Sequence, residues 1–234
     1  MEHIHTIPVL DALRDPMGCA FCVMLNKLEA DAVNFTLGPS YMEEDVRMET
    51  NKVGFCRHHM NAMYKHQNRL GLALMLHSHL QQLNYDTHNL MQNRTPAPFF
   101  RKNKNSVGER LKNHLKNVGE TCYICKKIEN TYEKYTDTFF HLWNKGGEDA
   151  KLIQSQKSYC LPHTVDLLTK IETRSKREKY LDTILPTLKN FMTEAEGDLS
   201  WFIQKFDHIN ADEPWKNSKD ALPRVIAMLG GLSQ

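Results

Sequence analysis

The sequence predicts an all-α protein, a helical bundle of two pseudo-repeated halves, each with a Cys3His metal site at the starts of its helices. Three observations lead to this prediction. Apolar residues recur at three- and four-residue steps along most of the 234-residue chain, as on amphipathic helices. No segment alternates between apolar and polar residues as a strand does. The pattern C-x-x-C followed by C-x-x-H occurs twice.

The four motifs contain all six cysteines of the chain. They read C-A-F-C at 19–22, C-R-H-H at 56–59, C-Y-I-C at 122–125 and C-L-P-H at 160–163. Residues 23–55 and 126–159 separate the motifs of each pair, which makes gaps of 33 and 34 residues. Thiolates and imidazole are ligands that suit zinc or an iron–sulfur cluster. The repeated spacing therefore predicts two metal sites.

Positions i and i+3 lie on one face of a helix, so a C-x-x-C and a C-x-x-H at two helix starts can converge on one ion. The nearly equal gaps favour pairing within each half. Pairing across the halves requires longer loops, whose closure costs more entropy, although only slowly with length. His58 competes as a ligand, but His59 matches the spacing of His163. The predicted sets are Cys19, Cys22, Cys56 and His59, and Cys122, Cys125, Cys160 and His163.

The donor set favours two zinc ions per chain, with [4Fe–4S] clusters as the alternative. Zinc accepts a tetrahedral Cys3His set, whereas iron–sulfur clusters are usually held by cysteines alone. Three disulfides would also use six cysteines, but they would not need the histidines. A closed four-ligand site holds structure and leaves no position open for a substrate. We therefore expect a structural role or a binding module, and no reaction can be identified.

Composition limits the partners and the location. The net charge is only +2, so no nucleic-acid partner is expected. No run of about 18 apolar residues occurs, so no membrane span is expected. The start, M-E-H-I-H-T, has neither a basic region nor an apolar stretch typical of a signal peptide. We expect a cytoplasmic protein with reduced thiols. Its partner, a protein or a small molecule, and its oligomeric state are left open.

The first half is expected to span 1–95. A short lead-in, 1–17, precedes a helix from about Cys19 to Phe35, which Gly38-Pro39 ends. Ser40 and Glu43 suggest a capping box that opens a short acidic helix. One long proline-free helix follows from Cys56 to about Met91. Prolines and basic residues then indicate a linker over 96–108.

The second half is expected to span 109–234 and to end in a long C-terminal helical region. A short amphipathic helix near 107–118 leads to Cys122, and an apolar seam then predicts a helix that Gly146-Gly147 stops. A polar connector over 148–158 precedes the helix that Cys160 begins. The rhythm of 178–209 predicts one long helix, kinked at Pro186, and a final helix covers 218–229.

The acidic segment 43–49 supplies the weak catalytic candidates. They are Glu43, Glu44, Asp45 and Arg47. Clustered carboxylates can bind a hard cation or exchange protons with a substrate. If they form a site, at least two of these side chains should be half-buried and Arg47 should bond a carboxylate. A metalloenzyme that uses this segment is one alternative function, and an iron–sulfur redox or regulatory protein is another, so whether the chain is an enzyme stays open.

The chain resembles a family through several quoted stretches along its whole length. Among them are C-A-F-C, L-G-P-S-Y-M-E-E-D-V-R, G-F-C-R-H-H, N-R-L-G-L-A-L, C-Y-I-C and Y-C-L-P-H. This set is similar to an uncharacterised bacterial family, found mostly in anaerobic Firmicutes and classed as a domain of unknown function. The resemblance implies a bacterial cytoplasmic protein with two Cys/His sites and no established activity. An anaerobic host would favour the iron–sulfur alternative.

Overall fold

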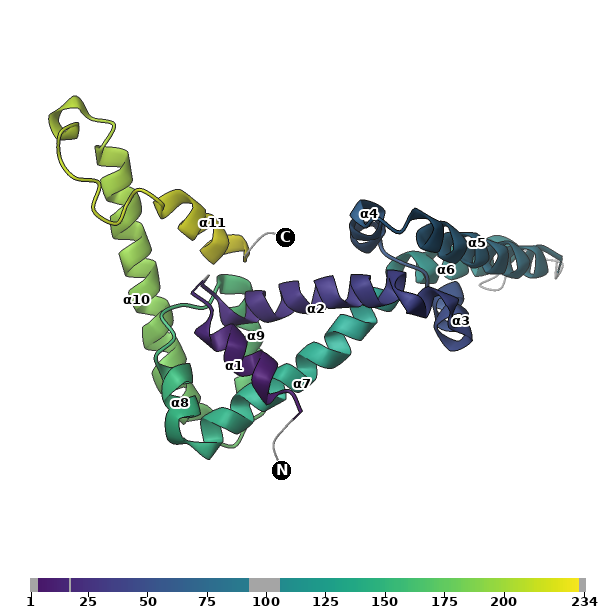
Figure 1. Cartoon of the computed structure of the whole chain (residues 1–234), viewed down its shortest axis with the longest axis horizontal. Helices are drawn as coiled ribbons and strands as arrows, with labels where there is room; N and C mark the ends of the chain where they lie inside the picture. Colours follow the sequence, from purple (N-terminus) through teal and green to yellow (C-terminus); the bar gives the residue numbers. More distant parts are fainter. Residues whose placement is uncertain (1–3, 17, 93–105, 232–234) are drawn as a thin grey trace, which may run out of the picture. The chain divides into compact units, whose positions relative to one another are not determined.

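The computed structural model describes residues 4–16, 18–92 and 106–231, and its regular elements are all helical (Figure 1). Over these ranges there are eleven α-helices and two short 3-10 helices, and no strand. The all-α prediction is confirmed. No helix within the same ranges combines the length and the apolar character needed to cross a bilayer.

The described chain divides into two compact units. The first contains the residues up to Lys27 and those from Tyr132 onward, and the second contains the residues from Leu28 to Thr131. This division differs from the consecutive halves expected at 1–95 and 109–234. Of the expected linker, 96–108, only its last three residues lie within the described ranges, and helix α6 begins there.

The first unit is built around a cluster of buried aromatic side chains. Trp143 is fully buried, and its ring packs against those of Phe140 and Tyr180 with centroids 6.3 and 4.9 Å apart. Aromatic pairs of this kind stabilise a core beyond the area that they bury. Its elements are α1 (Thr6–Arg14), the first turns of α2 (Ala20–Leu37), most of α7 (Tyr123–Lys145), α8 (Gly147–Gln154), α9 (Leu161–Glu172), α10 (Arg177–Gln204), η2 (His208–Asn210) and α11 (Ala221–Gly230).

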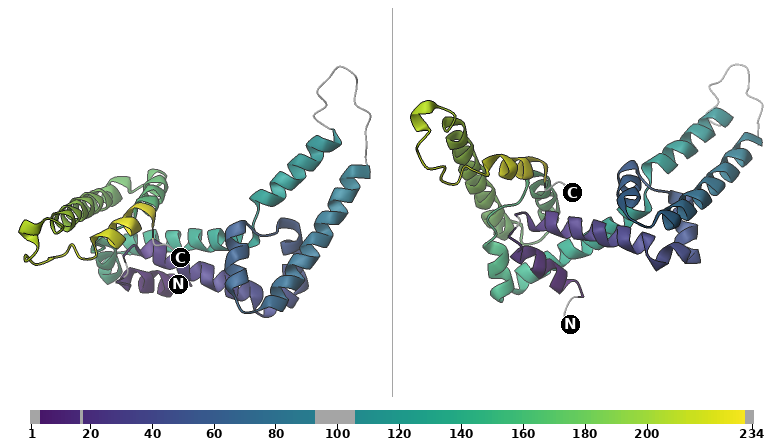
Figure 2. Two further views of the ribbon diagram at one scale, coloured as in Figure 1. Left: turned by 90° about the horizontal axis from the view of Figure 1, so that it is seen from above. Right: turned by 45° about the horizontal axis from the view of Figure 1, so that its top comes forward.

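The second unit has a smaller core, made mostly of aliphatic residues and methionines. Leu37, Met63 and Met75 are among its most deeply buried members. Helices α5 and α6 lie side by side (Figure 2). Arg110 near the start of α6 donates a hydrogen bond to the carbonyl of Leu90 near the end of α5. Its elements are the rest of α2, η1 (Pro39–Met42), α3 (Glu44–Val53), α4 (Arg57–Lys65), α5 (Arg69–Gln92), α6 (Val107–Glu120) and the first turns of α7.

The long helix expected from Cys56 to Met91 is two helices, α4 and α5, which was not foreseen. Asn68 causes the break, because its side chain takes the N-cap position of α5. Its Oδ1 accepts from the Gly71 backbone N–H at 2.8 Å, and its Nδ2 donates to the Leu37 carbonyl at 2.7 Å. Asparagine is a preferred N-cap residue, so a local polar contact overrides the continuous apolar pattern.

Four other expectations about the elements were wrong. The lead-in contains helix α1, and the connector at 148–158 contains helix α8, whose Ala150 and Ile153 are buried in the first core. The capping box at Ser40 is absent, because Ser40 lies inside η1 and Glu43 occupies the N-cap position of α3 without a side-chain cap. The long helix over 178–209 ends at Gln204.

Candidate metal centres

Each of the four cysteine motifs lies at the start of a helix. Cys56 and Cys160 are the N-cap residues of α4 and α9, and Cys19 and Cys122 directly precede α2 and α7. The free backbone N–H groups and the dipole at a helix start stabilise a thiolate. At the start of α7, the Cys125 N–H donates to the Cys122 Sγ at 3.5 Å. The helix starts therefore suit thiolate ligands.

The first cluster, defined as Cys19, Cys22, Cys160 and His163, lies in the first unit. Its four ligand atoms lie within 4.8 Å of one another. The Sγ atoms of Cys22 and Cys160 are 3.6 Å apart, and the Nδ1 of His163 lies 3.5, 3.3 and 3.0 Å from the sulfurs of Cys19, Cys22 and Cys160.

The second cluster, defined as Cys56, His59, Cys122 and Cys125, lies in the second unit. The Sγ atoms of Cys56 and Cys125 are 3.8 Å apart. The Nδ1 of His59 lies 3.3 Å from each of the three sulfurs. Two hydrogen bonds hold the start of α7 beside the turn that precedes Cys56. The Tyr123 N–H donates to the Gly54 carbonyl at 3.0 Å, and the Thr121 hydroxyl donates to the Val53 carbonyl at 2.7 Å.

Glycine is required at position 54 of this turn. Its φ is 63°, in the left-handed region that favours glycine, and a Cβ there would lie 2.7 Å from the His79 Nε2. His79 is itself fixed, because its Nδ1 lies 2.8 Å from the Asn51 carbonyl oxygen. The histidine therefore fills the space beside the turn, and it takes no part in a metal cluster.

The expected pairing within each half is wrong. The predicted residues all converge, but each C-x-x-C meets the C-x-x-H of the other half. Cys22 lies 3.6 Å from Cys160, and Cys56 lies 3.8 Å from Cys125. The two clusters are therefore closed by chain separations of 138 and 69 residues between these sulfurs. All six cysteines are free thiols, so the alternative of three disulfides has no support.

The distances fit ligands of one tetrahedral ion. Two sulfurs bound to zinc at about 2.3 Å lie about 3.8 Å apart in a tetrahedron, and a sulfur and a nitrogen lie about 3.6 Å apart. The observed Sγ–Sγ distances are 3.6 and 3.8 Å, and the Sγ–Nδ1 distances run from 3.0 to 3.5 Å. Both clusters thus have the donors and the spacing of a Cys3His site.

Crowded thiols also perturb the protonation of the first cluster. Hydrogen bonds to Cys160 and Cys22 lower the pKa of Cys19, and hydrogen bonds to Cys19 and Cys22 raise that of Cys160. Burial alone would lower the pKa of His163, but hydrogen bonds to Cys19 and Cys22 outweigh it and raise the value to about 9. A divalent cation would take the place of the shared protons.

The protonation of the second cluster is perturbed as well. Desolvation and the neighbouring Cys122 thiol raise the pKa of Cys125 to about 12, so the free group is a thiol at neutral pH. Burial lowers the pKa of His59, although the Glu29 carboxylate opposes this shift. A neutral imidazole is the form that binds a metal.

Glu29 completes the surroundings of the second cluster. This carboxylate is 7% exposed, and its Oε1 lies 3.2 Å from the His59 Nε2 and accepts a short hydrogen bond from His58. A carboxylate on the far nitrogen of a ligating histidine fixes its tautomer and orientation. His58 therefore does not join the thiolates. Glu29 was not among the predicted site residues, although a carboxylate between Leu28 and Ala32 on an apolar helix face is a signal.

A family model described as a family of unknown function, DUF6062, matches residues 1–234 of the chain. The chain belongs to this family. No curated protein matches the chain, and no solved structure matches it. The two clusters are the features of this DUF6062 chain that point to a function.

The acidic segment of the DUF6062 chain lacks the burial and the ion pair that were expected of it. Glu43, Glu44 and Asp45 are exposed, and Arg47 is half-buried. Arg47 donates to the Tyr41 carbonyl at 3.3 Å, and no carboxylate of the described residues lies within ion-pair distance of it. Glu43 to Asp45 lie at the N-terminus of α3, where acidic residues complement the helix dipole. The expected Arg47–carboxylate pair was wrong.

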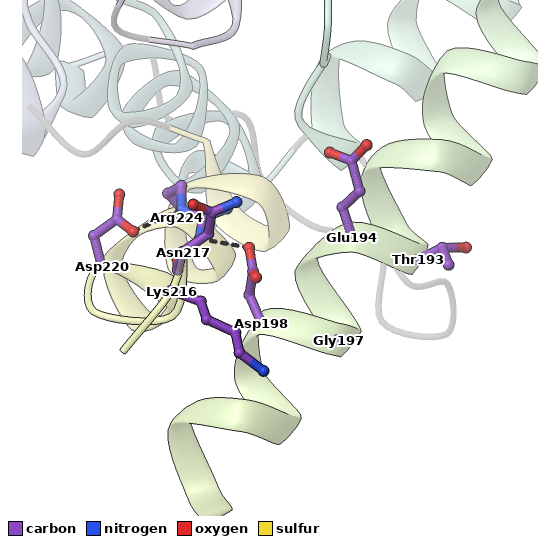
Figure 3. A pocket seen from close by; sticks show the side chains of 8 residues that line it. All are labelled: Thr193, Glu194, Gly197, Asp198, Lys216, Asn217, Asp220 and Arg224. Carbon is purple, nitrogen blue, oxygen red and sulfur yellow. Dashed lines mark hydrogen bonds and ion pairs between the residues drawn. The ribbon is translucent and has the colours of Figure 1, made fainter. Parts of the chain in front are cut away.

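An open cleft of about 460 Å³ lies between α10 and the start of α11 (Figure 3). Arg224 is its only arginine, and its guanidinium is held by Asp198 at 2.7 Å and by Asp220 at 3.1 Å. Lys216 and Arg224 are its two cationic side chains, and Glu194, Asp198 and Asp220 are three carboxylates, so the cleft offers little to an anionic ligand. The metal clusters are the better candidate sites.

Proposed function

We propose that this chain is a zinc-binding helical protein in which the first and second clusters each hold one ion, with a structural or binding-module role. The observation that supports this proposal is the tetrahedral spacing of three sulfurs and one Nδ1 in each cluster, with Sγ–Sγ distances of 3.6 and 3.8 Å. The proposed ligands are the eight residues predicted from the motifs, regrouped across the chain: Cys19, Cys22, Cys160 and His163, and Cys56, His59, Cys122 and Cys125.

The same spacing favours a single ion over a [4Fe–4S] cluster. Each ligand of a cubane cluster binds a different iron, so its ligands lie farther apart than two ligands of one ion. All four ligand atoms of each cluster lie within 4.8 Å of one another. A histidine in each set also favours zinc.

A structural role follows from the number of donors. Four protein ligands close the coordination sphere of zinc and leave no position for a substrate. Each set also joins two helix starts that are distant in sequence, so ion binding supplies folding free energy to its unit. The bacterial and cytoplasmic setting expected from the resemblance is consistent with reduced thiols.

Metal analysis of the full chain tests this proposal. The protein is purified without oxygen, its zinc and iron are measured by elemental analysis, and its visible spectrum is recorded. We expect about two zinc ions per chain and no absorbance band near about 400 nm. Iron and sulfide in stoichiometric amounts would support the iron–sulfur alternative. A chain with neither metal and with freely titrating thiols would overturn the proposal.

A further inference from the structure

The two clusters have the same donors but differ in their exposure to solvent. In the first cluster, Cys19, Cys22 and Cys160 are 6, 4 and 2% exposed. In the second, Cys125 is exposed, Cys56 is half-buried, and the contact between their sulfurs is open to solvent. A small oxidant can therefore reach the second cluster more easily than the first.

Neighbouring groups explain the protection of the first cluster. The backbone of Gly231, at the end of α11, lies over two of its sulfurs, since a Cβ there would lie 3.5 Å from the Cys22 Sγ and 3.9 Å from the Cys160 Sγ. The ring of Phe21 stacks on His163 with a centroid distance of 5.8 Å and lies 5.9 Å from that of Tyr159. Both rings are buried.

We infer that Cys125 is an oxidation site of this chain, and that Cys56 completes a disulfide with it when hydrogen peroxide reacts. This inference rests on the proposed function, because a bound cation keeps both sulfurs as thiolates. A thiolate that solvent can reach is the form of cysteine that peroxides oxidise.

The reaction balances with one peroxide as the oxidant. The Cys125 thiolate attacks one peroxide oxygen, the O–O bond breaks, and the sulfur becomes a sulfenic acid as the first water leaves. The Cys56 thiolate then attacks the Cys125 sulfur, the S–O bond breaks, and the second water leaves. The two thiolates lose two electrons in total, and the hydrogen peroxide gains these two electrons together with two protons from the solvent.

The geometry favours Cys56 over Cys122 as the second thiolate. Cys56 lies 3.8 Å from Cys125 on the open side, whereas Cys122 is 7% exposed and accepts a hydrogen bond from the Cys125 N–H. After the reaction, only His59 and Cys122 remain as donors in the second cluster. Two donors hold a divalent ion far more weakly than four, so oxidation releases the ion of this cluster and leaves that of the first.

Hydrogen peroxide added to the zinc-loaded full chain tests the inference. A chromogenic chelator follows zinc release, and alkylation with peptide mass spectrometry identifies the oxidised cysteines over time. We expect one of the two zinc ions to be released first, together with a Cys56–Cys125 disulfide, while the three thiols of the first cluster remain reduced. First oxidation at Cys19, Cys22 or Cys160, oxidation of both clusters at equal rates, or a Cys122–Cys125 disulfide would overturn it.

A variant and a control sharpen the test. Cys125→His removes the exposed thiol but keeps four donors, since zinc also accepts Cys2His2 sets. Glu44→Gln changes an exposed side chain outside both clusters. We expect Cys125→His to slow the first zinc release by about tenfold or more and Glu44→Gln to leave it unchanged. Equal rates of release in the two variants would also overturn the inference.

The initial zinc content separates this inference from the proposed function. A chain without zinc contradicts the proposed function before any peroxide is added. The inference then fails with it, because without a cation the Cys125 sulfur is a thiol and not a thiolate. A chain with two zinc ions and no preference for Cys125 contradicts the inference alone.

Discussion

The Sγ atoms of Cys22 and Cys160 lie 3.6 Å apart, although 138 residues separate them in the sequence. The contact joins the start of α2 to the start of α9 within one compact unit. A matching contact between Cys56 and Cys125 joins α4 to α7 in the other unit. Each cluster therefore links a segment before residue 60 to a segment after residue 120.

Phe21 should be essential to the first cluster, because it lies between the two cysteines of its motif and is fully buried. Its ring contacts that of Phe139 edge to face with centroids 5.0 Å apart. Phe21→Ala should lower the free energy of unfolding by about 3–5 kcal/mol and speed zinc loss from the first cluster. Urea denaturation and chelator kinetics measure the two effects.

Phe206→Ala is the matched control, because Phe206 is 76% exposed. It should change the free energy of unfolding by no more than about 0.5 kcal/mol. Equal effects of the two substitutions would mean that Phe21 does not pack as described.

Glu29→Gln should weaken zinc binding at the second cluster alone. The amide keeps the shape of the side chain but loses the charge beside the His59 Nε2, 3.2 Å away. Loss of such an outer partner typically lowers metal affinity by about 10- to 100-fold. Competition with a chelator of known affinity measures the change, and Glu44→Gln, at an exposed position, is the control. An unchanged affinity would show that Glu29 does not support the ligand.

Asn68→Ala should destabilise the second unit. The substitution removes the N-cap of α5 and leaves the Leu37 carbonyl without its donor. We expect a loss of about 1–2 kcal/mol in the free energy of unfolding, measured by urea denaturation. Gln67→Ala changes the exposed neighbouring residue and should have little effect. If both variants unfold like the unchanged chain, α4 and α5 are not divided by this cap.

Much of the fold could be predicted from the sequence. Apolar periodicity, glycines and cysteine motifs located helices such as α2, α7 and α9 within a few residues. The break at Asn68 was not predicted, because one side-chain cap acts against a continuous apolar pattern. Helix α8 was not predicted, because the buried Ala150 and Ile153 lie among polar residues in a segment of only eight residues. Short helices of this kind depend on tertiary contacts more than on their own pattern.

The eight cysteines and histidines of the two clusters were predicted, but their partners were not. The entropy cost of loop closure favours pairing within each half, since Cys56 follows Cys22 by 34 residues, whereas Cys160 follows Cys22 by 138. Two doublings of loop length cost only about 1.2 kcal/mol. Burial of a single phenylalanine contributes about 1.5–3 kcal/mol, so the packing of Phe21 against Phe139 outweighs that preference. Such contacts between distant segments are not visible in motif spacing.

Thiol mapping of the Cys160→Ser variant tests the crossed pairing most directly. The zinc-loaded variant is treated with a limiting amount of an alkylating reagent, and the rate at each cysteine is compared with that in the unchanged chain by peptide mass spectrometry. The structure predicts that Cys19 and Cys22 become reactive, whereas Cys122 and Cys125 keep their original rates. Exposure of Cys122 and Cys125 with continued protection of Cys19 and Cys22 would contradict the crossed pairing of the two clusters.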